Sequence, residues 1–259
     1  MLETIKCIKL QKNQLIKDIK KATIKEPFRG FPKISAKNCT HCNKCINVCP
    51  TNAIRKSNKE GLDKTLTIDM GKCTFCGECE RICDAGVIKF TNFHKNGSTI
   101  RENLIIKENS CGELDATKSN ELIKKMFGRS LKLRQVSAGG CNACEMELNA
   151  CSNANFDMGR FGIEFVASPR HADGIVITGP ITKNMANALE ETYQAISEPK
   201  IVILVGACAI SGGIFGLDGQ NSEELNREFL EKHKIDLYIP GCPAHPLTII
   251  NAILEFLGQ

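Results

Sequence analysis

The chain of 259 residues contains no tryptophan and only two tyrosines, and these absences limit its partners. Proteins that bind single-stranded nucleic acids stack the bases on aromatic side chains, so we expect no nucleic-acid partner. The most apolar run, residues 201–217, is rich in glycine and shorter than the roughly 20 residues that a membrane-spanning helix needs. We therefore expect no transmembrane segment either.

The amino-terminal region lacks the uninterrupted apolar core and the small-residue cleavage site of a secretory signal. We therefore expect the chain to stay in the cytosol, where thiols remain reduced. In that compartment, clustered cysteines are interpreted as metal ligands before disulfides.

Residues 1–30 form a basic amino-terminal arm. They contain eight basic and three acidic residues, a balance of +5 that equals the formal charge of the whole chain. Apolar residues in this arm recur at approximately helical spacing, namely Ile5, Ile8, Leu15, Ile16 and Ile19. This pattern suits either a helix that contacts a partner or an anionic membrane, or an arm that is solvated or packs on its own domain.

The cysteines are far more numerous than is usual, with 15 in this chain. Two crowded runs, "CTHCNKCINVCP" at 39–50 and "CTFCGECERICD" at 73–84, align at a constant offset of 34 residues. The same offset aligns "AI" at 53–54 with "VI" at 87–88. This segment is therefore an internal duplication.

Each half of the duplication has the C-x2-C-x2-C-x3-C spacing of bacterial-type ferredoxins, whose fourth cysteine ligates the cluster of the other half. The spacing predicts that one 4Fe-4S cluster is held by Cys39, Cys42, Cys45 and Cys83, and a second by Cys73, Cys76, Cys79 and Cys49. Three thiolates on a tight loop grip three iron corners, and backbone amides of the loop point at the sulfurs. A zinc ribbon is the alternative, but it leaves about half of these thiols without a role.

The two halves differ after the fourth cysteine. Pro50 follows Cys49, whereas Asp84 stands where proline is expected after Cys83. A carboxylate there would lower the potential of a nearby cluster. His41 is interpreted as a surface residue or a modest tuner of potential, because the thiol set is already complete.

Residues 96–130 are polar and mixed, with one short helical stretch near 121–127, and we interpret them as a linker. Cys111 lies alone in this linker, as do Cys7 and Cys151 elsewhere in the chain. Lone cysteines of this kind are usually structural or incidental.

From residue 131 onward, short β-branched runs alternate with amphipathic segments. The runs at 131–136, 163–168, 174–180, 200–207 and 236–241 predict strands, and the segments at 183–196 and 246–257 predict helices. This alternation predicts an α/β flavodoxin-like domain with a parallel sheet, behind an α+β dicluster ferredoxin domain.

Four of the five cysteines in this region follow predicted strands. The carboxyl ends of parallel strands share one edge of a sheet, so distant thiols converge there. We expect a third 4Fe-4S cluster on Cys141, Cys144, Cys208 and Cys242. Neighbouring glycines let the backbone approach such a cluster. The alternative is a phosphate-binding loop at "SGGIFG", with unrelated buried cysteines.

Four stretches of the second half carry a family resemblance: "FGRSLKLRQVSAGGCNACEMELNA", "RFGIEFVASPRHADGIVITGPITKNM", "GACAISGG" and "PGCPAHP". They resemble the small subunit of energy-converting nickel-iron hydrogenases of group 4, such as formate hydrogenlyase, and the homologous 20 kDa subunit of complex I. "FRGFPKI" and "IDMGKCTFCGECE" resemble the separate dicluster ferredoxin subunit of these complexes. The chain thus resembles two fused subunits, with an arm at 1–30, a ferredoxin-like domain at 31–95, a linker at 96–130 and a small-subunit domain at 131–259.

The resemblance implies the same third ligand set. Complex I subunits usually have two adjacent cysteines at the first ligand position, whereas Asn142 and Ala143 separate Cys141 from Cys144 here, which favours the hydrogenase side. The family places the nickel-iron centre in a partner large subunit. It further implies membrane subunits, a soluble donor such as ferredoxin or a formate dehydrogenase subunit, and a peripheral position on the cytoplasmic face of the membrane.

The resulting hypothesis is an oxidoreductase subunit, not catalytic alone, that relays electrons through three 4Fe-4S clusters. One rival is a nickel-free, complex I-like assembly that reduces quinone or another acceptor, and another is a structural zinc docking protein. The sequence leaves open the roles of four residues near the predicted third cluster or the interface: Glu145, Arg170, His171 and His245. Glu145 suits proton exchange or potential tuning, and the alternative is a solvent-facing or capping carboxylate at the start of a helix.

Overall fold

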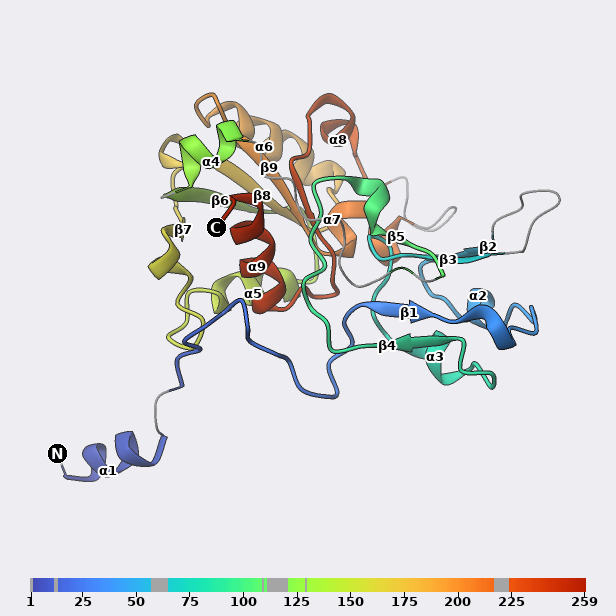
Figure 1. Cartoon of the computed structure of the whole chain (residues 1–259). Coiled ribbons are helices and arrows are strands. Elements are labelled where there is room, and N and C mark those ends of the chain that lie inside the picture. The colour runs from blue at the N-terminus through green and yellow to red at the C-terminus, as the bar shows by residue number, and fades with distance from the viewer. Residues whose placement is uncertain are drawn as a thin grey trace.

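The computed structural model describes residues 2–11, 14–56, 65–108, 110, 121–128, 130–216 and 224–259. Figure 1 shows a first module (residues 32–106) that packs beside a larger second module (residues 131–257), with helix α1 (Leu2–Gln11) standing away from both. Cys111 lies outside the described residues.

The duplication in the sequence is a duplication of structure. β1 (Pro32–Ile34), α2 (Lys44–Asn47) and β2 (Ile54–Lys56) recur 34 residues later as β3 (Leu66–Asp69), α3 (Glu78–Arg81) and β4 (Ile88–Phe90). β1 pairs with β4 and β2 pairs with β3, both antiparallel, so each half lends a strand to the other. This exchange brings the fourth cysteine of each half close to the loop of the other.

The beginning of the expected linker belongs to the first module instead. β5 (Ile105–Ile106) pairs antiparallel with β3, and Leu104 and Ile106 are buried in the core of this module. A two-residue strand leaves no periodicity in the sequence, which explains why this segment was predicted to be a connector. The predicted helix near 121–127 is present as α4 (Glu121–Phe127).

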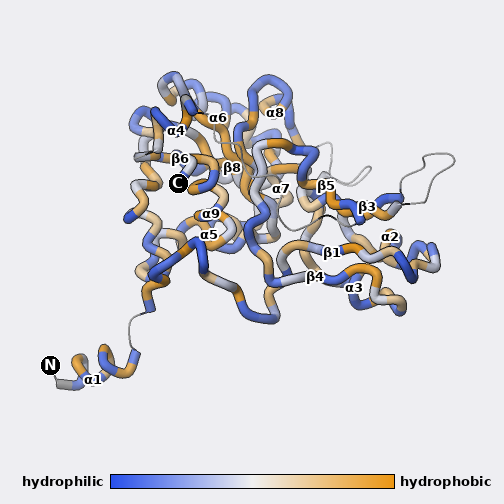
Figure 2. Tube along the Cα trace, in the orientation of Figure 1, coloured by the Kyte–Doolittle hydropathy of each residue, from blue (hydrophilic) through white to orange (hydrophobic). Residues whose placement is uncertain are grey.

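The second module contains a parallel five-stranded sheet. Its strands are β6 (Leu131–Ser137), β7 (Ile163–Phe165), β8 (Gly174–Thr178), β9 (Ile201–Val205) and β10 (Leu237–Ile239). They lie in the order β10-β9-β8-β6-β7, and every neighbouring pair is parallel. This is the flavodoxin-like order, so the predicted fold class is confirmed. β8 and β9 are buried along their whole length, and Figure 2 shows the apolar colour of the residues at β8.

Helices cover this sheet and shape its carboxyl edge. They are α5 (Ala143–Ala150), α6 (Lys183–Gln194), α7 (Ala207–Ser211), α8 (Glu228–Lys232) and α9 (Pro246–Phe256). Short 3-10 turns complete the chain at Ala36–Asn38, Arg101–Leu104, Met158–Phe161, Pro169–His171 and Gly213–Phe215. In the part of the chain that the structure describes, no helix has both the length and the apolarity needed to cross a bilayer.

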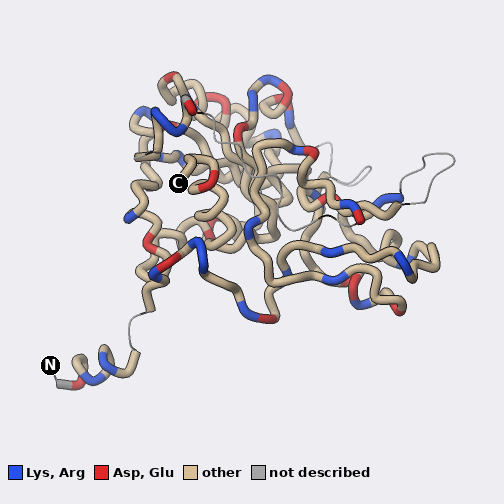
Figure 3. The backbone as a smooth tube through the Cα atoms, viewed as in Figure 1, with Lys and Arg blue, Asp and Glu red and all other residues tan. Residues whose placement is uncertain are grey.

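The basic arm has two different structures. α1 ends at Gln11 and keeps Ile5 and Ile8 exposed, and Figure 3 shows the positions of basic residues along it in blue. The helical spacing is wrong beyond this point, because Ile16 and Ile19 do not lie in a helix. Ile19 is only 1% exposed and packs in the core of the second module. This later part of the arm therefore packs on its own chain, as one of the alternatives predicted.

Candidate functional site

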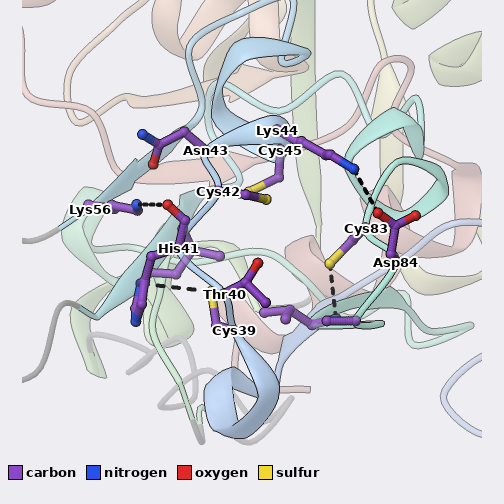
Figure 4. Close-up of a pocket in the computed structure, with 13 residues that line it drawn as sticks. Cys39, Thr40, His41, Cys42, Asn43, Lys44, Cys45, Lys56, Cys83 and Asp84 are labelled. Atoms are coloured by element: carbon purple, nitrogen blue, oxygen red, sulfur yellow. Dashed lines mark hydrogen bonds and ion pairs between the residues drawn. The ribbon is translucent and has the colours of Figure 1, made fainter.

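The first thiol set surrounds a hollow in the first module. Its lining includes Cys39, Cys42 and Cys45 from one half of the duplication and Cys83 from the other, around a cavity of about 150 Å³. Figure 4 shows these side chains around the hollow. The strand exchange thus places Cys83 beside the thiols of the first half, as the predicted crossed ligation requires.

The second set has the corresponding arrangement. Cys73, Cys76 and Cys79 lie around a smaller hollow of about 10 Å³, together with Cys49 from the first half. Arg29, which precedes β1, donates from Nε to the carbonyl oxygen of Phe75 at 2.6 Å and so supports this loop.

The same backbone turn presents the cysteines in both halves. His41 and Asn43 have φ values of 56° and 64°, and Phe75 and Gly77 repeat them 34 residues later at 53° and 80°. These left-handed positions curl each loop around its hollow.

Backbone amides point at three of the sulfurs, as the ferredoxin spacing predicts. They donate at 3.3 Å in each case, from Ala53 to Cys49, from Phe75 to Cys73 and from Val87 to Cys83. Amide donors of this kind stabilise negative charge on a ligating sulfur.

The third set lies at the carboxyl edge of the parallel sheet. Cys141 and Cys144 follow β6, Cys208 follows β9, and Cys242 follows β10. Glycine is required beside two of them. A Cβ atom on Gly206 would lie 2.5 Å from the sulfur of Cys144, and one on Gly213 would lie 2.9 Å from that of Cys208, and both glycines have positive φ.

Burial makes many of these thiols hard to ionise by themselves. It raises the pKa of Cys79 and Cys144 to about 12 and that of Cys208 to about 11, and it also raises the pKa of Cys45, Cys73 and Cys242. Thiolates of the same set add to this effect because they repel one another. Exposed Cys42 is the exception, because the backbone amide of Lys44 lowers its pKa.

The donor chemistry of these sites fits a metal cluster. Thiols with raised pKa values become thiolates when a metal supplies the compensating positive charge. Among the residues that the structure describes, no three His, Cys, Asp or Glu side chains converge as they would around a single metal ion. The ferredoxin spacing of the four thiols at each hollow of the first module suits a cluster better than one tetrahedral zinc ion.

The second set interacts electrostatically with both of the others. After burial and other thiols of its own set, the negative charge of Cys45 also raises the pKa of Cys79. Likewise, after burial and Cys141, the charge of Cys76 raises the pKa of Cys242. The contacts between the modules therefore bring the thiols of the second and third sets into each other's electrostatic field.

Glu145 is a buried carboxylate beside the third set, so the alternative of a solvent-facing side chain is wrong. It is 5% exposed, and its Oε1 accepts hydrogen bonds of 2.6 Å from the hydroxyls of Ser137 and Thr178. Its negative charge contributes to the raised pKa of Cys144, where burial is the largest cause.

Two accessory residues of the first module lie at its first hollow. His41 is exposed, with its Nδ1 at 3.9 Å from the sulfur of Cys39. Asp84 forms an exposed ion pair of 2.7 Å with Lys44, which ties the loop after Cys83 to α2. Much of the negative charge of Asp84 is thereby offset beside the first set.

The sequence also left open the roles of three residues of the second module, Arg170, His171 and His245. Arg170 and His171 are exposed and lie just before β8, at the amino edge of the sheet and away from the thiols. His245 accepts from the backbone amide of Leu247 at 3.1 Å and thus caps α9. Burial lowers the pKa of His245. These placements favour turn, surface and capping roles.

Arg227 is a residue near the third set that sequence reasoning missed. Its guanidinium donates to four backbone carbonyls, three of which belong to α7, the helix that carries Cys208. No sequence motif indicates such an interaction, because the acceptors are main-chain atoms. For Arg29, the signal in the sequence was its position in "FRGFPKI", a segment that resembles the dicluster ferredoxin subunit.

Comparison with known proteins agrees with this architecture. Residues 141–256 match the family described as NADH ubiquinone oxidoreductase, 20 kDa subunit, and residues 38–87 match the 4Fe-4S dicluster domain. The membrane-bound sulfane sulfur reductase, an archaeal respiratory membrane complex, contains a chain with 29% identity and a TM-score of 0.44. That match covers 53% of this chain and 73% of the other.

Three of the relatives show the range of proteins that the chain is similar to. A probable membrane-bound hydrogenase subunit of Pyrococcus furiosus is 35% identical over 52% of this chain and 78% of its own length. Formate hydrogenlyase subunit 7 of Escherichia coli is 40% identical over 55% of this chain and 54% of its own length. An NADH-quinone oxidoreductase subunit of Citrifermentans bemidjiense is 40% identical over 45% of this chain and 65% of its own length. The chain therefore belongs to the family of the 20 kDa subunit of NADH ubiquinone oxidoreductase, and it is an oxidoreductase subunit with a 4Fe-4S dicluster domain ahead of that region.

Proposed function

We propose that the chain is the electron-transfer subunit of a membrane-associated nickel-iron hydrogenase complex that faces the cytoplasm. In this role it relays electrons through three 4Fe-4S clusters to or from a nickel-iron centre in a partner large subunit. Membrane subunits anchor the complex, and a soluble donor such as ferredoxin or a formate dehydrogenase subunit exchanges electrons with it.

The residues that hold the clusters follow from the three thiol sets. The first set consists of Cys39, Cys42, Cys45 and Cys83, the second of Cys49, Cys73, Cys76 and Cys79, and the third of Cys141, Cys144, Cys208 and Cys242. Each cluster supplies one-electron redox chemistry, and the protein supplies ligands, burial and amide hydrogen bonds that set its potential.

One observation carries the proposal: the thiol sets follow one another through the two modules. Cys49 and Cys83 each lie at the hollow of the other half, and the backbone hydrogen bonds between Ser98 and Tyr238 join the first module to the strand that precedes Cys242. A relay needs this succession, whereas a docking module built on isolated zinc ions does not. The first module (residues 32–106) and the second module (residues 131–257) then serve a single path.

The hydrogenase assignment rests on the third set. Asn142 and Ala143 separate Cys141 from Cys144, where complex I subunits usually have adjacent cysteines. The named relatives include both a formate hydrogenlyase subunit and an NADH-quinone oxidoreductase subunit. A nickel-free complex that reduces quinone is therefore the second candidate, and the identity of the partner discriminates between them.

The test is to purify the chain with its partners under anaerobic conditions and to measure iron, acid-labile sulfide, nickel and zinc. We expect about twelve iron and twelve sulfide per chain, four of each per cluster, with nickel in the large subunit. The same iron without nickel would shift the assignment to the quinone-linked complex. Zinc without iron or sulfide would overturn the relay altogether.

A further inference from the structure

Arg227 is tied to the loop that carries Cys208. Its Nη1 donates to the carbonyl oxygens of Pro180 at 3.2 Å and of Cys208 itself at 3.4 Å. Its Nη2 donates to those of Ala209 and Ile210, both at 3.0 Å. The last carbonyls of a helix have no partner within it, so this fork fixes the end of α7. Cys208 lies within that helix, so Arg227 fixes the position of the ligand.

Arg227 pairs with no carboxylate in the part of the chain that the structure describes. Its guanidinium is half-buried. Burial lowers the pKa of Arg227, and the anionic form of Cys208 is the interaction that opposes this shift. The hydrogen bonds to α7 hold this cation next to the ligand Cys208.

The neighbouring residue Arg101 offers a comparison, because its charge is paired with a carboxylate. Arg101 lies close enough to Arg227 for their charges to repel. Its Nη2, however, pairs with Asp69 at 2.7 Å. Arg101 therefore has a counter-ion in the protein, whereas the hydrogen bonds of Arg227 among the described residues go to backbone carbonyls. Retaining an unpaired, partly buried cation is costly unless a bound anion balances it.

We propose that Arg227 is a positioning residue of the third cluster, and that its positive charge makes this cluster easier to reduce. This inference rests on the proposed function, because it requires a cluster on the third thiol set. The charge of the surroundings and the hydrogen bonds near the sulfurs are both known to set the potential of an iron-sulfur cluster. Arg227 supplies positive charge, and its hydrogen bonds to main-chain carbonyls position the helix that carries Cys208.

Two substitutions separate charge from hydrogen bonding. Arg227→Lys keeps the positive charge but loses the planar fork, whereas Arg227→Gln keeps an amide donor and loses the charge. Iron and sulfide are measured first, and the third cluster is then titrated by electron paramagnetic resonance in the purified complex. In Arg227→Gln we expect the reduction equilibrium to become at least tenfold less favourable, equal to about 59 mV for one electron. The shift in Arg227→Lys should be clearly smaller.

Arg160→Gln is the matched control, because Arg160 also donates to a backbone carbonyl, that of Ile16, at 2.6 Å. It should leave the titration of the third cluster unchanged. Loss of the third cluster from Arg227→Gln alone would also support the proposal. Equal shifts in both Arg227 variants, no shift in either, or loss of the cluster from both would overturn the role of the charge. If the unsubstituted chain has no third cluster, the proposed function fails instead, and the iron content reveals this before any variant is compared.

Discussion

Ser98 and Tyr238 exchange two backbone hydrogen bonds, of 3.0 and 2.8 Å, and so join the first module to β10 of the second. β10 leads directly to Cys242, while the segment around Ser98 leads through Arg101 to β5 and the first module's core. The contact therefore ties the module that holds the second thiol set to the strand that precedes Cys242 of the third. Its geometry depends on Gly97, because a Cβ atom there would lie 2.4 Å from the Cβ of Ala252.

Gly97→Val should loosen this contact without touching any thiol. We expect overpacking to lower the free energy of unfolding by about 1–3 kcal/mol, as measured by urea denaturation. All three clusters should remain by iron analysis, while reduction of the third cluster by the donor becomes slower. Gly159→Ala is the control, because its new Cβ would meet nothing closer than Asp157 Oδ1 at 4.0 Å. Normal transfer in a destabilised Gly97→Val chain would contradict the role of the interface.

Cys49→Ser should remove the cluster of the other half. Cys49 lies at the hollow of Cys73, Cys76 and Cys79, and the amide of Ala53 donates to its sulfur. A hydroxyl is a poor substitute for a thiolate, so we expect about four fewer iron atoms and loss of the second cluster's resonance signal. Cys83→Ser is the reciprocal variant and should affect the set of Cys39. Loss of the same signal from both variants would disprove the crossed ligation.

Cys242→Ser should affect the third cluster alone. Its partners follow β6 and β9 of the same sheet, and none of them lies in the first module. Iron should fall by about four per chain, and the two signals of the first module should persist. If either of those signals disappears as well, the second module does not hold its cluster independently.

The parts of the fold that follow from local patterns could be predicted from the sequence. The 34-residue offset is visible in the cysteines and recurs in strands, helices and left-handed turns. β8 and β9 were predictable because a fully buried parallel strand is a continuous run of apolar residues. The positions of the thiols at one sheet edge follow from the same logic.

Features that depend on distant contacts were not predictable. α1 ends at Gln11 although the apolar spacing continues, because Ile19 packs into the second module instead of extending a helix. Glu145 is buried because hydroxyls from β6 and β8 converge on it, which no single segment reveals. Arg227 donates to main-chain carbonyls, which every residue has, so the sequence does not reveal its acceptors.

The lone cysteines should differ in reactivity. Cys7 is exposed on α1, whereas Cys151 is fully buried and its thiol donates to the carbonyl of Glu147 at 3.2 Å. Burial, together with the charge of Glu147, raises the pKa of Cys151. Iodoacetamide should therefore label Cys7 in the native protein and Cys151 only after unfolding, as read by mass spectrometry. Native labelling of Cys151 at a rate near that of Cys7 would contradict its burial.

The raised pKa of Cys151 makes the stability of the folded chain depend on pH. In the unfolded chain Cys151 ionises near its ordinary pKa of 9.0, while in the folded chain it stays protonated at higher pH. The unfolded state then binds fewer protons, so the folded state loses stability as pH rises above about 9. Cys151→Ala should reduce this alkaline loss, as measured by urea denaturation at pH 8 and pH 10. An unchanged pH dependence would contradict the prediction.

Glu145→Gln tests whether the negative charge of Glu145, opposite in sign to that of Arg227, also sets the potential of the third cluster. The glutamine carbonyl keeps an acceptor for Ser137 and Thr178, so the fold is preserved, while the buried negative charge disappears. We expect the third cluster to become easier to reduce, with the equilibrium changed about tenfold, or about 59 mV for one electron. Glu147→Gln on the same helix is the matched control, since Glu147 contacts Cys151 rather than the third set. Because Glu145 and Arg227 act on the same thiols with opposite charge, combining Glu145→Gln with Arg227→Gln should return the potential toward its original value. A combined variant that titrates like Arg227→Gln alone would show that the carboxylate orders the hydroxyls and does not set the potential.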